Sequence, residues 1–175
     1  MGYSLAMETA NDQQNPARSR HVIRLQDEVA AGLLGLLGEA RRRVDIFSPR
    51  LDPALFNTQG ATAALAAVAT RNRLSRVRIL IEDSQQLVRD NIRLVNLARR
   101  FSDFVRLQRL GEEHIGLNET IVLVDGRASL YQADLARHEY VIERGGGHGT
   151  AELVLRFNAM WDRSEPIPEI HTTGL

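Results

Sequence analysis

Apolar and polar positions along the chain alternate between helical spacing and short runs typical of buried strands. Apolar residues three and four positions apart predict amphipathic helices over 28–43, 58–70, 85–101 and 150–163. Short apolar runs predict strands at 44–48, 77–81, 105–110, 120–124, 128–131 and 139–143. Strands that alternate with helices and then end in a hairpin predict an α/β layered fold, with a mixed β-sheet flanked by helices.

Turn and cap residues locate the ends of several elements. Asp27 and Ser84 stand before two predicted helices, where a side-chain oxygen can cap the first turn. Asp52-Pro53 opens a short turn or helix, since Pro is tolerated in a first turn. Residues 1–20 are polar with little apolar periodicity, which predicts a disordered or extended arm. The domain is therefore expected over 21–163, followed by an extended tail at 164–175.

Composition narrows the classes of function. A chain of 175 residues with 43% hydrophobic residues is long enough for one domain with a sizeable core. The formal net charge of zero leaves no global field to attract nucleic acid or an anionic membrane. The absence of Cys excludes disulfides and thiolate zinc sites. No apolar stretch approaches the roughly 20 residues of a membrane span, and residues 1–19 lack a signal-peptide pattern, so a cytoplasmic protein is expected.

The stretch from Asn118 to Gly126 carries the pattern that points most directly to chemistry. Asn118 and Thr120 are separated by one spacer and precede an apolar run that ends in Asp125. This frame resembles the His-x-Lys-x4-Asp motif of the phospholipase D superfamily. Asp125 could instead serve only to cap the turn before Gly126, which with the following Arg127 is a hairpin signal.

The resemblance to a phospholipase D-like half domain covers about residues 24–163. It includes Ser48-Pro49 at the end of the first predicted strand and the Phe157-x3-Trp161 pattern in the closing helix. The resemblance implies a phospholipase D-like fold. Because members with one motif per chain pair two chains, it also implies a homodimer.

The resemblance places unsuitable residues at the catalytic positions. In a working member the His attacks phosphorus, while Lys and Asn hold the phosphoryl oxygens. Asn118 would stand at the His, Thr120 at the Lys, Asp134 (or Leu135, with a one-residue gap) at the Asn, and Glu139 at the family Glu. All 22 basic residues are Arg, so the chain contains no Lys that could replace the missing one. These residues predict a catalytically inactive domain that acts as a binding or assembly module.

Five residues are candidates for contact with a ligand: Ser48, Arg50, His114, Asn118 and Thr120. Asn118 and Thr120 face the same way on a strand and could line a polar cleft, or form an ordinary solvated face. His114 as a displaced nucleophile would give an active phosphodiesterase or nuclease, although four residues span about 13 Å of extended strand. Arg50 offers bidentate phosphate contacts, which would suit a phosphate- or nucleic-acid-binding remnant.

Two further clusters have both a structural and a functional interpretation. The Gly-rich segment 144–150 precedes a helix, where it could hold an anion or serve as a flexible connector. Arg41, Arg42 and Arg43 fall in the last turn of a predicted helix, as do Arg99 and Arg100, and cations there complement the helix dipole. These arginines could also form an anion-binding patch with Arg18, Arg20 and Arg24, but the neutral total charge argues against it.

The sequence contains no pattern for a metal or a cofactor. His138 lies next to Glu139 but has no partner His at metal-ligand spacing, so neither a metal nor a cofactor is expected. The expected partner is a second copy of the chain or another protein, with a phosphate-containing ligand as a further candidate. Nucleic acid and membrane are not expected as partners.

Overall fold

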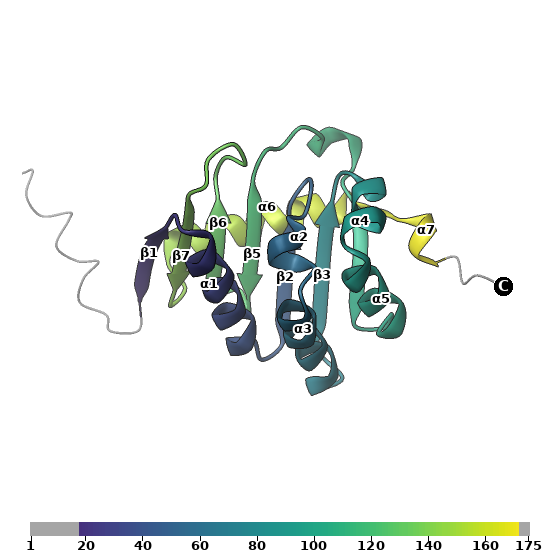
Figure 1. Cartoon of the computed structure of the whole chain (residues 1–175), viewed down its shortest axis with the longest axis horizontal. Coiled ribbons are helices and arrows are strands. Elements are labelled where there is room, and N and C mark those ends of the chain that lie inside the picture. Colours follow the sequence, from purple (N-terminus) through teal and green to yellow (C-terminus); the bar gives the residue numbers. More distant parts are fainter. Residues whose placement is uncertain (1–17, 172–175) are drawn as a thin grey trace, which may run out of the picture.

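The structure is a computed structural model that describes residues 18–171 of the chain. Within this range one eight-stranded sheet has the strand order β1-β7-β6-β5-β2-β3-β4-β8 (Figure 1). The strands are β1 (Ser19–Ile23), β2 (Arg43–Phe47), β3 (Arg76–Ile81), β4 (Val105–Arg109), β5 (Thr120–Val124), β6 (Ala128–Gln132), β7 (Tyr140–Arg144) and β8 (Glu165–Pro166).

The strand directions make this a mixed sheet and define its two edges. β2, β3 and β4 run parallel, whereas β5 pairs antiparallel with β2 and continues through the antiparallel strands β6, β7 and β1. The ends of β2, β3 and β4 therefore lie at the same edge as the start of β5, and we call this the carboxyl edge. The opposite amino edge holds the starts of β2, β3 and β4 and the β5–β6 hairpin.

Helices cover both faces of the sheet. Figure 1 shows the first five helices in front of the sheet and α6 behind it. The helices are α1 (Gln26–Glu39), α2 (Pro53–Phe56), α3 (Gln59–Arg71), α4 (Ser84–Asp90), α5 (Ile92–Arg100), α6 (His148–Asp162) and α7 (Pro168–His171), with a 3-10 turn, η1, at Glu112–His114. The expected α/β fold with a mixed sheet flanked by helices is confirmed.

The core has two layers because side chains alternate across each strand. Val122 and Val124 of β5 join the apolar layer beneath α1, α3 and α5, whereas Ile121 and Leu123 join the layer beneath α6. Every residue of β5 is buried. The strand that carries the motif is therefore covered on both faces within one subunit.

Several predicted boundaries were wrong. α1 ends at Glu39, so the arginines at 41–43 lie beyond its last turn: Arg41 and Arg42 lead into β2, and Arg43 is its first residue. The N-cap residue of α1 is Leu25, and no side chain forms a capping hydrogen bond with the first turn. The cap expected from Asp27 is therefore not formed. The helix expected over 85–101 is two helices that meet at Asn91. Asp83 rather than Ser84 caps α4, because its carboxylate accepts a 2.9 Å hydrogen bond from Gln86 N.

The ends of the described range also carry elements that the sequence did not indicate. Ser19 and Arg20, expected in the arm, begin β1 and pair with β7, while residues 1–17 lie outside the described part of the chain. Residues 164–171 were expected to be extended. They include the short extended strand β8 and then form α7, and Ile167 and Ile170 are buried against the core.

Among residues 18–171, no helix combines the length and apolar character needed to cross a lipid bilayer.

Candidate functional site at the carboxyl edge

Thr120 and Ser48 meet at the carboxyl edge of the sheet. Phe47 of β2 pairs with Ile121 of β5, so the residue after β2 lies beside the first residue of β5. Thr120 Oγ1 donates to Ser48 Oγ at 3.1 Å, and Ser48 Oγ donates to the carbonyl of Arg50 at 2.9 Å. Thr120 is 4% exposed and Ser48 is 1% exposed. Both hydroxyls therefore bond within the chain, and neither lines an open cleft.

Asn118 is tied to the loop between β6 and β7. Its amide Nδ2 donates to Asp134 Oδ1 at 2.9 Å, and its carbonyl accepts from Leu135 N at 3.1 Å. Asp134 Oδ1 also accepts from Ala136 N at 2.9 Å. Arg137 Nε lies 3.8 Å from the other carboxylate oxygen of Asp134. Two positions singled out in the sequence are thus brought together, and the carboxylate at 134 stands next to the amide at 118.

Asp125 lies at the opposite, amino edge of the sheet. It occupies the turn of the β5–β6 hairpin with a φ of 53°. Its carboxylate accepts hydrogen bonds from the backbone N–H groups of Arg41, Arg42 and Arg43 at 2.8, 2.9 and 2.8 Å. Partial burial opposes ionisation, but these three donors and the Arg43 guanidinium hold the pKa of Asp125 below its ordinary value. Asp125 is a structural anchor between two loops.

Glu139 and Arg50 each form a surface ion pair. Arg24 donates to Glu139 Oε2 from Nε at 2.9 Å and from Nη2 at 2.7 Å. Arg50 Nη2 lies 3.1 Å from Oδ2 of Asp83, the residue that caps α4. The hydrogen bond from Gln86 N has the largest effect on the pKa of Asp83 and, together with the bond from Arg50, keeps it below its ordinary value although burial opposes this. Arg50 is therefore engaged in holding the start of α4.

His114 ends the short turn η1 at the same edge. It is half-buried, and its backbone N–H donates to Gly111 O at 3.0 Å. The imidazole makes no hydrogen bond or ion pair with the described residues. Of the five ligand candidates, the structure links Ser48 with Thr120 through their hydroxyls and with the backbone carbonyl of Arg50, whereas His114 and Asn118 have separate surroundings.

A polar cluster on the α6 side was missed by the sequence interpretation. Tyr131 Oη donates to Glu119 Oε2 at 2.6 Å, and Arg156 of α6 forms an ion pair with Glu119 Oε1. Burial, and then the bond to Glu119, raises the pKa of Tyr131. Strand alternation was the available signal, because Glu119 lies between Asn118 and Thr120 and must face the other side of the sheet.

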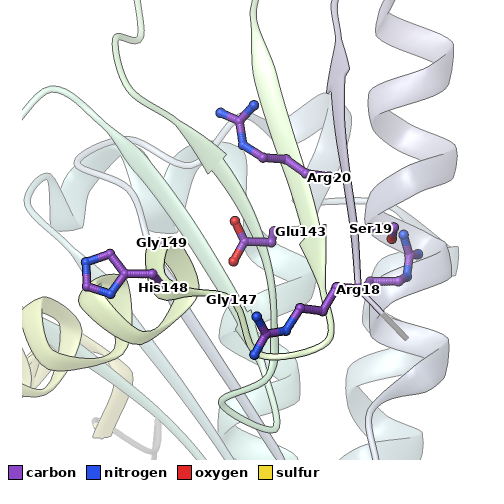
Figure 2. A pocket seen from close by; sticks show the side chains of 8 residues that line it. Arg18, Ser19, Arg20, Glu143, Gly147, His148 and Gly149 are labelled. Atoms are coloured by element: carbon purple, nitrogen blue, oxygen red, sulfur yellow. The ribbon is translucent and has the colours of Figure 1, made fainter. Parts of the chain in front are cut away.

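The Gly-rich segment packs around Glu143 at the start of α6. Glu143 Oε1 accepts from Thr150 N at 3.2 Å and from Thr150 Oγ1 at 3.0 Å. A Cβ at position 147 would clash with this carboxylate, so Gly147 permits its close approach. Figure 2 shows the Glu143 side chain between the Gly-rich turn and Arg20. These residues line a cavity of about 360 Å³ together with Arg18 and His148. The chain's own carboxylate thus takes the place at the helix N-terminus that an external anion would need.

Within residues 18–171, no group of three or more His, Cys, Asp or Glu side chains is placed to hold a metal ion.

Comparison with known proteins identifies a family and a fold. Residues 25–172 match the model of a family described as "Domain of unknown function (DUF7931)". No curated protein matches the sequence. The structure is similar to Nuc, a phospholipase D family member from Salmonella typhimurium, with a TM-score of 0.65 and 14% identity. That match covers 86% of this chain and 98% of Nuc.

Two further solved structures share the fold. NucT from Helicobacter pylori has a TM-score of 0.61 and 12% identity, over 86% of this chain and 99% of NucT. Phosphatidylserine synthase from Haemophilus influenzae has a TM-score of 0.56 and 15% identity, over 88% of this chain and 41% of the synthase. The chain therefore has the α/β fold of the phospholipase D family.

Proposed function

The chain belongs to the DUF7931 family of domains of unknown function, and from that premise we propose that it is a catalytically inactive phospholipase D-like domain that serves as a binding or assembly module. The observation that carries the proposal is the 2.9 Å hydrogen bond from Asn118 to Asp134. When the His-x-Lys-x4-Asp motif is matched to residues 118–125, Asn118 takes the position of the nucleophilic His. A carboxamide cannot attack phosphorus, and here it is already engaged with a carboxylate.

Electrostatics at the carboxyl edge also disfavours a phosphodiester. A phosphate that approached Asn118 would meet the carboxylate of Asp134. Two like unit charges 4 Å apart near a protein surface repel by about 4 kcal/mol. Arg137 offsets part of this repulsion from 3.8 Å, but its side chain is 83% exposed, so solvent screens the contact.

Thr120, which stands at the Lys of the phospholipase D motif, also has a structural role. Thr120 is buried and bonded to Ser48. An ammonium group at this position would lose its hydration without gaining a carboxylate in exchange. This supports a site whose polar residues maintain the fold rather than stabilise a transition state.

Catalytic inactivity can be tested with purified protein and two substrates, bis(p-nitrophenyl) phosphate and phosphatidylcholine. We expect no hydrolysis of either above the buffer background. Hydrolysis that is lost in a His114→Ala variant and kept in His148→Ala would overturn the proposal and establish a displaced nucleophile. His148 is the matched control because its side chain is 89% exposed on α6.

The assembly that we propose is a homodimer formed through the carboxyl edge. β5 is covered on both faces, so two copies can approach each other's motif only through the end of this strand and its neighbouring loops. Leu25 and Ile115 lie at this edge and are 65% and 58% exposed, which provides apolar surface for a contact. A twofold contact would be isologous and should bury at least about 1,000 Å².

Sedimentation velocity at micromolar concentration tests the dimer. We expect twice the mass of the chain for the wild type and for Leu155→Glu, a control at an exposed position on α6. Ile115→Glu should sediment as a monomer with an unchanged far-ultraviolet spectrum, because a buried charge opposes the contact. A monomeric wild type would remove the homodimer and leave a different protein as the partner.

A further inference from the structure

Arginine side chains gather at the amino edge, at the opposite end of the strands from Asn118 and Thr120. Five of them line one cavity of about 570 Å³ together with Leu74 and Asp125. We call these five residues the arginine patch: Arg41, Arg42, Arg43, Arg76 and Arg127. They come from the α1–β2 connection, the starts of β2 and β3 and the β5–β6 hairpin, so only the fold brings them together.

The fold holds the patch in place despite the repulsion between like charges. Arg43 and Arg76 are direct register partners on the parallel strands β2 and β3, an arrangement of like charges that destabilises a sheet. The three backbone bonds to Asp125 fix the segment that carries Arg41, Arg42 and Arg43. The clustering of these arginines therefore lowers folding stability, so a contribution to the fold does not explain it.

Most arginines of the patch have no counter-charge among the carboxylates of the described residues. Only Arg43 has a carboxylate within 4.0 Å, since its Nε lies 3.3 Å from Asp45 Oδ2, outside hydrogen-bond geometry. Arg76 Nη1 donates to the carbonyls of Arg73 and Ser75, and its guanidinium lies 5.9 Å from the centroid of the Phe104 ring, so its contacts include no carboxylate. The zero net charge of the chain thus conceals a local excess of positive charge at this edge.

We propose that the arginine patch binds single-stranded nucleic acid through its phosphate backbone. Guanidinium groups bind phosphate oxygens in a bidentate fashion, and strands about 4.8 Å apart present them as a row across the edge. Leu74 is 56% exposed within this row and offers apolar surface to an unstacked base or a sugar. Contacts of this kind position a strand without reading its sequence.

Fluorescence anisotropy with a labelled oligothymidylate tests the proposal on the full chain, titrated between about 50 and 200 mM salt. Four phosphate contacts predict a slope of about −3 for log K against log salt, at roughly 0.7 per contact on a single strand. Arg41→Gln/Arg42→Gln should lower this slope by about 1.4 in magnitude and weaken binding at least tenfold.

The matched control is Arg93→Gln/Arg109→Gln, which removes two charges from exposed arginines outside the patch. It should bind like the wild type, and both variants should melt at the wild-type temperature. Absence of binding at the lowest salt, or an equal loss in both variants, would overturn the proposal. Tighter binding of a labelled polyglutamate peptide than of the oligonucleotide would also overturn it, in favour of an acidic protein partner. None of these readouts depends on activity or dimerisation at the carboxyl edge.

Discussion

Arg78 donates a 2.7 Å hydrogen bond from Nε to Asp45 Oδ1, its register partner on the neighbouring strand β2. The Asp45 side chain is only 2% exposed. Nη2 of Arg78 also donates to Asn158 Oδ1 of α6 at 3.0 Å. The same guanidinium lies over the rings of Phe157 and Trp161, 5.0 and 5.3 Å from their centroids. One cation thus joins two strands to the helix on the rear face of the sheet.

Arg78→Met is expected to lower the free energy of unfolding by about 3–5 kcal/mol, because Asp45 would stay buried without its main partner. A double variant, Asp45→Leu/Arg78→Met, should be less destabilised than Arg78→Met alone, since no buried charge remains unpaired. Urea denaturation followed by circular dichroism measures both effects.

The control is Glu165→Gln, which breaks a surface ion pair with Arg109 whose side chains are 49% and 55% exposed. Such a pair contributes about 0–1 kcal/mol. If Arg78→Met were no more destabilised than Glu165→Gln, the buried network would have no special part in holding α6.

The sheet and most helices could be predicted because their apolar periodicity is local. Phe157 and Trp161 are four residues apart in the amphipathic helix predicted over 150–163, so they share one face of it. Phe157 is fully buried, and Trp161 stacks on it at 6.1 Å but remains partly exposed. A periodic pattern thus identifies the buried face of a helix, whereas the exact depth of a residue at its margin depends on the neighbouring elements.

The polar contacts could not be predicted because their partners are distant in the sequence. Thr120 and Ser48 are 72 residues apart, and Asp125 is more than 80 residues from the backbone donors that hold it. The sequence does not distinguish a polar strand residue that is exposed to solvent from one that is hydrogen-bonded in the core. The ion pair of Glu139 with Arg24 likewise joins residues that are 115 positions apart.

Asp125→Asn is expected to destabilise the protein by about 1.5–3 kcal/mol at neutral pH, since its carboxylate accepts three backbone hydrogen bonds. Asn is the appropriate replacement because it tolerates the positive φ of 53° at this turn. Asp125→Ala should be worse, since it adds backbone strain to the lost bonds. Thermal unfolding of the three proteins gives this order, and an Asp125→Asn protein that melts like the wild type would contradict it.

The pH dependence of stability provides a separate check on Asp125. Its pKa is lower in the folded state than the ordinary value of about 3.9. A lowered pKa means that the carboxylate contributes fully above the ordinary value, and that this contribution is lost as the pH falls through the folded-state pKa. The stability difference between wild type and Asp125→Asn should therefore shrink as the pH is lowered from 5 toward about 2. A difference that stays constant over this range would show that the charge of Asp125 has no part in stability.

Thr120→Lys should destabilise the domain by about 3–5 kcal/mol, because it would bury an unpaired ammonium at a position that is 4% exposed. Thr120→Val removes only the hydroxyl that donates to Ser48 and should cost about 1 kcal/mol. Guanidinium denaturation separates the two values. If Thr120→Lys were as stable as Thr120→Val, the position would have room for an ammonium group, and burial would not disfavour Lys there.

Gly147→Ala should destabilise the start of α6, because a Cβ at this position clashes with the Glu143 carboxylate. Glu143 would then have to leave its bonds with the amide and hydroxyl of Thr150. The lost charge-assisted bonds are worth about 1.5–3 kcal/mol. Gly38→Ala is the matched control, since no atom lies within 4 Å of a Cβ there and it falls inside α1. That change should stabilise the protein by about 0.5–1 kcal/mol, because Ala loses less backbone entropy in a helix. Opposite shifts of the melting temperature in the two variants are therefore expected, and a Gly147→Ala protein that gained stability like Gly38→Ala would show that Glu143 can leave the start of α6 without cost.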